Sequence, residues 1–313
     1  MKLADSPVTL HQFGDFSFYL KRDDQLHAQF SGNKARKFMP LLEQALPDVD
    51  TLICYGSAQA NSLYSLAALA SLRGWQLEFY VDHVPGWLKQ NPNGNYRAAL
   101  ALGAQIIETR ALSQLHPKQH IAQYRQPNSH CLVLEEGGRN PIAKQGVTAL
   151  GNELISWIAR QPEQQWRVAL PSGTGTTALY LHQTLAPHGI EVVTCPCVGD
   201  QGYLLEQFDQ LIGQTQPVAH NQAPAERYPT IISPSSKHHF GRLYAEDYQI
   251  WQQLRAQTEV EFDLLYDPLM WRLLRHWLPT QPDKSLLYIH QGGLLGNESM
   301  LARYQRQFGH SLA

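Results

Sequence analysis

Short runs of β-forming residues alternate with helix-forming segments along almost the whole chain, and this order constrains the fold more than any other feature. The apolar run at 51–55 ends at Gly56, and residues 61–72 then carry leucines at helical spacing before a stop at Gly74. Parallel strands need a crossover connection, usually a helix. The repeated strand–helix–strand order therefore predicts parallel sheets with helices on both faces.

The same alternation continues through the second half of the chain. Further helices are expected at 94–102, 141–158 and 175–185, and further strands at 77–81, 105–107, 131–134, 166–170, 190–197, 262–265 and 285–290. A chain of 313 residues has room for about two domains. We predict an α/β protein with two doubly wound, mostly parallel sheets, divided near residues 40 and 150.

Composition excludes several classes of protein. Lys and Arg number 25 against 27 Asp and Glu, and a near-neutral chain lacks the basic face that nucleic-acid binding requires. No apolar run approaches the roughly 18 residues that span a bilayer, and no secretory signal is visible. Four cysteines are too few for a disulfide scaffold and fit a reducing compartment. We expect a cytoplasmic protein that binds a small molecule, with no metal site.

The segment after the strand at 166–170 has the composition of a phosphate-binding loop. Glycines let backbone amides turn toward an anion, and the helix that follows adds a favourable dipole at its N-terminus. Ser172 and three threonines supply further neutral donors. The predicted cofactor-binding residues here are Gly173, Thr174, Gly175, Thr176 and Thr177.

Two other interpretations of this loop stay open. The sequence of the loop also matches G-x-G-x-x-A, the dinucleotide fingerprint, which would indicate a nicotinamide enzyme. That fingerprint requires an acidic residue at the end of the next strand, where this chain has Cys195-Pro196-Cys197. The loop would otherwise be a Gly/Thr-rich helix entry with a structural role only.

Lys34 lies in an unusual place for a lysine. With Arg36 and Lys37 it occupies the first turn of a helix capped by Ser31 or Asn33, where the positive end of the helix dipole disfavours cations. Either these side chains lie in water, or the site requires a lysine with a lowered pKa. The dipole and the neighbouring cations favour the neutral, nucleophilic amine. Such an amine forms a Schiff base with an aldehyde, so a lysine beside a phosphate loop indicates pyridoxal phosphate.

Several blocks of the sequence, in order, resemble one family of pyridoxal phosphate enzymes. Residues 20–24 (Leu-Lys-Arg-Asp-Asp), 32–37 (Gly-Asn-Lys-Ala-Arg-Lys) and 56–62 (Gly-Ser-Ala-Gln-Ala-Asn-Ser) are similar to its entry strand, cofactor-lysine motif and ring loop. Further similar blocks lie at 94–95, 102–104, 136–140, 172–177, 266–267 and 290–293. The family is that of 1-aminocyclopropane-1-carboxylate (ACC) deaminase and D-cysteine desulfhydrase, which has fold type II and is tryptophan synthase β-like.

The resemblance implies an architecture and a catalytic lysine. A large cofactor-binding domain would comprise residues 1–39 and 150–313, with a small domain of residues 40–149 inserted in it. The cofactor would lie in the cleft between them, bound covalently to Lys34. Members of the family are generally homodimers or larger.

The resemblance also implies substrate contacts at Gln59, Ala60, Asn61 and Ser62, in the loop that receives the substrate carboxylate. The family usually has Ser where this chain has Ala60, which cannot move a proton. Asn61 has two interpretations: a hydrogen bond to the phenolic oxygen of the cofactor, or the N-cap of the helix at 61–72.

Three residues near the C-terminus complete the predicted site. Tyr266 is a candidate acid or base, although an aromatic residue before a helix is often part of the core. Asp267 lies where the deaminases carry the Glu that faces the pyridine nitrogen, yet Asp267 followed by Pro268 is also a good helix cap. Gln291 lies where deaminases carry Leu and desulfhydrases Thr, so it matches neither.

Together these features predict a lyase or deaminase that converts a small amino acid into a 2-keto acid and ammonia. We favour the D-cysteine desulfhydrase type, with sulfide release, because proton abstraction by lysine suffices for it. ACC ring opening is the alternative, and Asp267 supports it. A cofactor-binding homologue with impaired catalysis, as Ala60 suggests, and a nicotinamide-dependent oxidoreductase are the remaining hypotheses.

Overall fold

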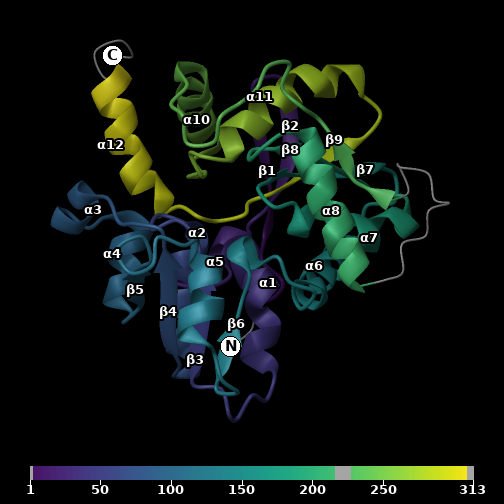
Figure 1. Ribbon diagram of the computed structural model, residues 1–313. Coiled ribbons are helices and arrows are strands. Elements are labelled where there is room, and N and C mark those ends of the chain that lie inside the picture. The colour runs from purple at the N-terminus through teal and green to yellow at the C-terminus, as the bar shows by residue number, and fades with distance from the viewer. Residues whose placement is uncertain (1–2, 216–226, 309–313) are drawn as a thin grey trace.

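The computed structural model describes residues 3–215 and 227–308, which form two sheets and their covering helices (Figure 1). The larger sheet has the order β1-β2-β10-β7-β8-β9. Within it only β1 and β2 pair antiparallel. Its strands are β1 (Val8–Phe13), β2 (Phe16–Lys21), β7 (Trp166–Ser172), β8 (Glu191–Pro196), β9 (Thr230–Ile231) and β10 (Ser285–Ile289).

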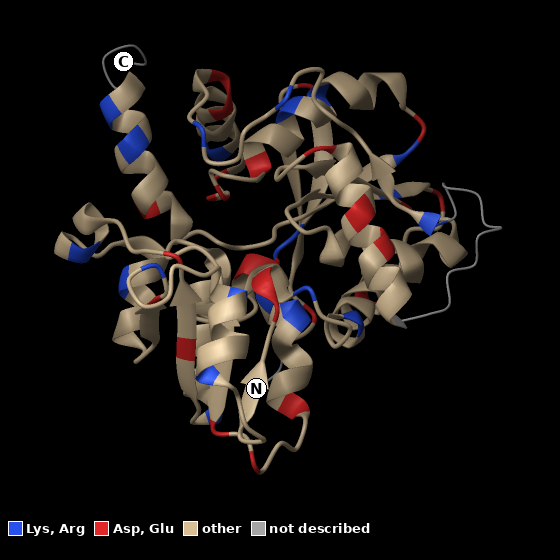
Figure 2. Cartoon of the chain, in the orientation of Figure 1, with Lys and Arg blue, Asp and Glu red and all other residues tan. Residues whose placement is uncertain are grey.

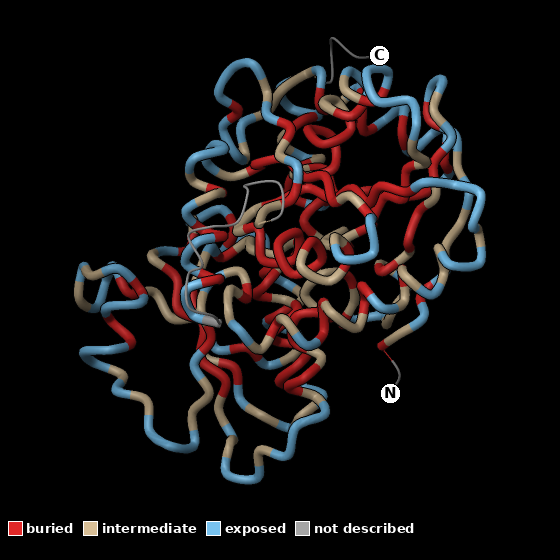
Figure 3. The backbone as a smooth tube through the Cα atoms, turned by 90° about the vertical axis from the view of Figure 1, so that its right-hand side faces the viewer, coloured by how far each residue is buried: buried red, intermediate tan, exposed pale blue. Residues whose placement is uncertain are grey.

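Alternate residues of the larger sheet pack against different helices. Leu286 and Tyr288 of β10 pack with α10 (Ala245–Thr258), α11 (Asp267–Trp277) and α12 (Gly296–Phe308). Leu287 and Ile289 pack with α6 (Ala143–Ile158), α7 (Thr176–Leu185) and α8 (Gln201–Thr215). This period of two is that of a strand buried on both faces. The buried residues accordingly gather at the centre of the molecule (Figure 3).

The smaller sheet has the order β5-β4-β3-β6 and is parallel. Its strands are β3 (Thr51–Tyr55), β4 (Gln76–Val81), β5 (Gln105–Glu108) and β6 (Cys131–Val133). Helices α1 (Gly32–Glu43), α2 (Asn61–Arg73), α3 (Gly86–Gln90) and α4 (Gly94–Ala101) contribute to the main apolar cluster of this sheet. Short α5 (Pro117–His120) leads to Ile121, which packs with a smaller cluster around Ile53 and Tyr80.

Helix α1, which carries Lys34, lies against α6 at a close backbone approach. A Cβ on Gly146 of α6 would lie 1.8 Å from the Arg36 carbonyl oxygen, so only glycine fits there. The Arg36 side chain is fully buried and pairs with Asp23 at 2.8 Å and Glu153 at 2.5 Å. These contacts fix the lysine-bearing helix against the larger sheet's layer.

The predicted fold class is confirmed, with one strand wrong. Residues 262–265 form a turn and not a strand, because the Asp263 carboxylate accepts hydrogen bonds from the backbone N–H groups of Leu265 (2.7 Å) and Tyr266 (2.9 Å). Acidic and basic residues are interspersed around both sheets (Figure 2). No helix among residues 3–215 and 227–308 is both long and apolar enough to cross a membrane.

Candidate active site

The residues that the sequence selects all line one cavity of about 440 Å³, a size typical of small-molecule sites. The loops that form it follow the carboxyl ends of β3, β7, β8 and β10, where ligands bind in open α/β sheets. The predicted residues among its lining are Lys34, Gln59, Ala60, Asn61, Ser62, Gly173, Thr174, Gly175, Thr176, Thr177, Tyr266, Asp267 and Gln291.

Gln291 connects the lysine helix to the phosphate loop. The Asn33 backbone N–H donates to the Gln291 carbonyl oxygen (3.0 Å), and the Asn33 amide donates to Gln291 Oε1 (2.9 Å). Gln291 Nε2 in turn donates to the Pro171 carbonyl oxygen (2.7 Å). Gly32 has φ +66°, and a Cβ there would lie 2.0 Å from the Gln291 carbonyl oxygen. These contacts therefore fix the N-terminus of α1 relative to the segment around Gln291 and to the phosphate loop.

Lys34 has the lowered pKa that the sequence predicts, but for a different reason. Burial lowers the pKa of its amine to about 8. Arg36 does not contribute as predicted, because its side chain points into the ion pairs with Asp23 and Glu153. Lys37 was not predicted as a site residue. It lines the cavity, where its Nζ donates to the Gly137 carbonyl oxygen (2.6 Å).

The predicted phosphate loop ends at the N-terminus of α7. Gly175, with φ +71°, caps this helix, and a Cβ there would lie 2.4 Å from the Phe208 ring. Thr174 and Thr176 share a hydroxyl hydrogen bond of 3.2 Å. Thr177 Oγ1 is buried and has no hydrogen-bond partner in the described part of the chain. An unpartnered hydroxyl beside free helix amides is what a phosphate group would satisfy.

Asn61 bridges the two sheets' layers instead of capping a helix. Ala60 is the N-cap of α2, so the capping interpretation of Asn61 is wrong. The Asn61 amide donates to Asp263 Oδ2 (3.3 Å), and Asn61 Oδ1 accepts from the Asn95 amide (2.8 Å). The side chain that was predicted to contact the cofactor is thus held from both sides at the edge of the cavity.

Asp263 was missed because it falls inside the segment predicted as a strand. It is buried, lines the cavity and accepts the hydrogen bonds of the turn and of Asn61. Burial raises the pKa of its carboxyl to about 6. The signal that was available is an acidic residue within an otherwise apolar run.

Asp267 begins α11, but the prediction that it caps this helix is wrong, since the N-cap is Tyr266. Its carboxylate accepts from the Tyr288 hydroxyl (2.6 Å) and from the Asp263 backbone N–H (2.9 Å). Burial, and then the charge of Asp263, raise its pKa to about 8. Burial also raises the pKa of the Tyr266 phenol, which therefore stays protonated at neutral pH.

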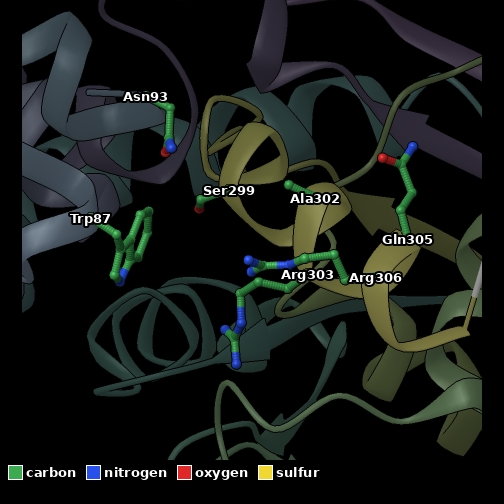
Figure 4. A pocket seen from close by; sticks show the side chains of 7 residues that line it. All are labelled: Trp87, Asn93, Ser299, Ala302, Arg303, Gln305 and Arg306. Atoms are coloured by element: carbon green, nitrogen blue, oxygen red, sulfur yellow. The ribbon is translucent and has the colours of Figure 1, made fainter. Parts of the chain in front are cut away.

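A second hollow adjoins the cavity at α12. It has a volume of about 520 Å³, lies between α3 and α12, and shares Ser299 and Arg303 with the cavity (Figure 4). Trp87, nearly half exposed, lies across from Arg306 in this hollow. Ser299 and Arg303 of α12 therefore line both spaces.

Comparison with known proteins gives relatives along nearly the whole chain, although no family model matches. D-cysteine desulfhydrase of Serratia proteamaculans is 26% identical over 290 residues, which cover 88% of this chain and 86% of the relative. A putative ACC deaminase of Thermotoga maritima is 23% identical over 298 residues, with 90% of each chain covered.

Solved structures show the same fold. A structure described as an ACC deaminase homologue has a TM-score of 0.70 at 20% identity and covers 96% of this chain and 95% of its own. Threonine deaminase isoform 2 from Solanum lycopersicum has a TM-score of 0.65 at 14% identity and covers 98% and 84%. The resemblance seen in the sequence blocks is confirmed: the chain is related to enzymes named D-cysteine desulfhydrase and ACC deaminase, and it has their fold.

Proposed function

We propose that the protein is a pyridoxal phosphate-dependent lyase of the D-cysteine desulfhydrase type. It would convert D-cysteine and water into pyruvate, ammonia and hydrogen sulfide. The observation that carries this proposal is the pairing, in one cavity, of a lysine with a pKa near 8 and a helix N-terminus with an unpartnered buried hydroxyl. Relatives with that name, at modest identity, support it.

The described residues fit the cofactor. Lys34 would hold its aldehyde carbon, and the N-terminus of α7 with Thr174, Thr176 and Thr177 would hold its phosphate. When bound, the cofactor supplies an electron sink for the substrate carbon that loses a proton. The donors of this loop, its backbone amides and threonine hydroxyls, are neutral, which suits a phosphate monoester.

Residues of this chain would then carry the proton transfers. The Lys34 amine is neutral above pH 8 and would take the proton from the substrate Cα. Tyr266, which remains protonated, would donate to the departing sulfur. The loop at 57–62 and the N-terminus of α2 would hold the substrate carboxylate, with Gln59, Ala60 and Ser62 in its wall.

Absorbance and product release test this function. We expect a cofactor absorbance band in the purified protein that Lys34→Ala abolishes, and sulfide and ammonia release from D-cysteine. Ammonia release from ACC without activity on D-cysteine would replace the proposal by the deaminase alternative, which the relative from Thermotoga supports. An intact band with no release from D- or L-cysteine or ACC would indicate the impaired homologue.

We further propose that residues 40–149 form an inserted small domain, because β3 to β6 form a sheet of their own. The four cysteines form no disulfide, which supports a cytoplasmic location. Family resemblance supports a homodimer, and analytical ultracentrifugation would test that state.

A further inference from the structure

Among the carboxylates that line the cavity, one has no hydrogen bond or ion pair with the described part of the protein. Lys37, Asp263, Asp267 and Arg303 each have hydrogen-bond partners, Arg303 donating to the Gly241 carbonyl oxygen at 2.9 Å. The Glu136 carboxylate lines the same cavity and, among the described residues, forms no hydrogen bond or ion pair. Glu136 is exposed, whereas most of the other residues that line the cavity are buried or partly buried. A ligand in the cavity can therefore reach this carboxylate.

Glu136 lies between the two loops that would bind the ends of a substrate–cofactor pair. A Cβ on Gly56, next to the 57–62 loop, would lie 3.3 Å from Glu136 Oε1. On the other side, a Cβ on the following Gly137 would lie 3.1 Å from Thr174 Cγ2 in the phosphate loop. The charge of Glu136 also acts on Lys34, whose pKa it raises. The carboxylate thus faces the position where the reacting part of the substrate would lie.

An unpaired carboxylate in the partly buried wall of a cavity distinguishes substrates by their charge. Burial raises the pKa of the Glu136 carboxyl, while the charges of His116, Arg139 and Lys34 act in the opposite direction. A cationic or hydrogen-bond-donating group on the substrate would satisfy it, and a second carboxylate on the substrate would be repelled.

We propose that Glu136 is a specificity-determining residue. Among the β-substituted amino acids that this site accepts, D-cysteine included, it favours those whose β-substituent is a protonated amine and disfavours those ending in a carboxylate. This proposal rests on the proposed function, since it concerns the substrate of the same site. The corresponding elimination balances without any oxidant or reductant: 2,3-diaminopropionate and water give pyruvate and two molecules of ammonia. The Cα–H and Cβ–N bonds would break first, with Lys34 taking the Cα proton and the β-nitrogen leaving as ammonia beside Glu136. Cβ would then take up a proton, and water would replace the α-nitrogen at Cα, which releases the second ammonia and forms the keto group of pyruvate.

Kinetics on matched substrates test the selection. With cofactor bound, kcat/KM is measured for 2,3-diaminopropionate and for β-chloroalanine, whose β-substituent is neutral, using both enantiomers of each. We expect Glu136→Gln to lower the ratio of the two values about tenfold or more, since an effect of Glu136 on Lys34 acts on both substrates and cancels in the ratio. Glu136→Ala should act in the same direction.

Glu135→Gln provides a matched control. Glu135 is the preceding residue, is engaged by Tyr55 and by Lys118 at 2.8 Å, and does not line the cavity. Its substitution should leave the ratio unchanged. If Glu135→Gln changed this kcat/KM ratio as much as Glu136→Gln does, the proposal would be contradicted. An unchanged ratio in Glu136→Gln would contradict it as well.

Binding gives a readout that does not depend on turnover. 2,4-Diaminobutyrate and homoserine differ only in a terminal ammonium or hydroxyl, and neither carries a leaving group at Cβ. Titrated against the cofactor absorbance band, the diamine should bind wild type about tenfold more tightly, and Glu136→Gln should abolish that difference. Equal affinities in wild type would overturn the selection by Glu136. If no β-substituted amino acid reacts at all, the proposed function fails, which is a separate result.

Discussion

Lys34 should make cofactor attachment depend on pH near neutrality. Burial brings the pKa of its amine from 10.5 to about 8, and only the neutral amine attacks an aldehyde. The rate at which cofactor-free protein takes up pyridoxal phosphate should therefore rise about tenfold per pH unit below 8 and level off above it. Absorbance after rapid mixing measures this rate, with N-acetyl-lysine methyl ester as a reference amine. A rise that continues to pH 10 would contradict it.

Asp267 should make stability fall as the pH rises. Its pKa is about 8 in the folded protein and 3.8 ordinarily, so between these values the folded state binds the proton that the unfolded state has lost. The stabilisation is present below pH 4 and is lost as the pH rises through 8. Asp267→Asn stays neutral, so its melting temperature relative to wild type should increase from pH 5 to pH 8. Exposed Asp15→Asn should show no such trend.

At this scale the sequence identifies residues through local chemistry alone. Lys34 and the threonine loop could be predicted because a cation at a helix N-terminus and a Gly/Thr-rich helix entry are unusual within a few residues of chain. The partners of Asn61 could not, since Asp263 and Asn95 are 202 and 34 residues away. Glu136 carries no local signal either, because its availability depends on which side chains surround it.

The contact between α1 and α6 should be intolerant of a single methyl group. A Cβ at Gly146 would lie 1.8 Å from a backbone oxygen of α1, so Gly146→Ala must separate the two helices. We expect a loss of about 1–3 kcal/mol in the free energy of unfolding, as for other overpacked cores, measured by urea denaturation. Cofactor affinity should fall with it, since α1 carries Lys34.

Gly213→Ala in α8 is the matched control. Nothing lies within 4 Å of a Cβ there, and alanine favours helix over glycine, so this variant should be more stable by roughly 0.5–1 kcal/mol. Gly146→Ala as stable as wild type would show that α1 and α6 do not pack as described.

Most elements could be predicted because hydrophobic periodicity is a local property. Among the strands that were predicted, the wrong one is 262–265. It has a strand's composition, but Asp263 binds the backbone amides that a strand would present to a neighbour. In the sequence, a side chain that binds its own backbone amides shows only as a single polar residue in an apolar run.

Asn95 of α4 should support the cavity loop whose Asn61 reaches across to Asp263 in the larger sheet's layer. Its buried amide donates to Asn61 Oδ1 (2.8 Å) and to the Gln59 carbonyl oxygen (3.1 Å), which links α4 to the cavity loop. Asn95→Ala leaves both acceptors unpaired and should cost about 2–3 kcal/mol. Calorimetry should show a lower melting temperature, and fluorescence titration a weaker cofactor affinity. Exposed Asn91→Ala should change neither.

The presence of two sheets could be predicted from the order of strands and helices, because right-handed crossovers leave few arrangements. The predicted strands did not include β1 or β9 of the larger sheet. How the two sheets meet could not be predicted in this way. It depends on contacts such as the ion pair between exposed Arg97 and Glu298 (2.8 Å), whose residues are 201 apart in the chain. The cleft between the two domains was expected only because of the family resemblance.

The position of β10 has a consequence for how the protein is made. The strands of the smaller sheet all lie within residues 51–133, so that sheet has its complete set of strands early in synthesis. β10 is made after every other described strand, yet it lies between β2 and β7. Until it emerges from the ribosome, the N-terminal hairpin has no strand to join it to β7. Gln291 lies two residues after the end of β10, so the lysine helix acquires its anchor in the same late step.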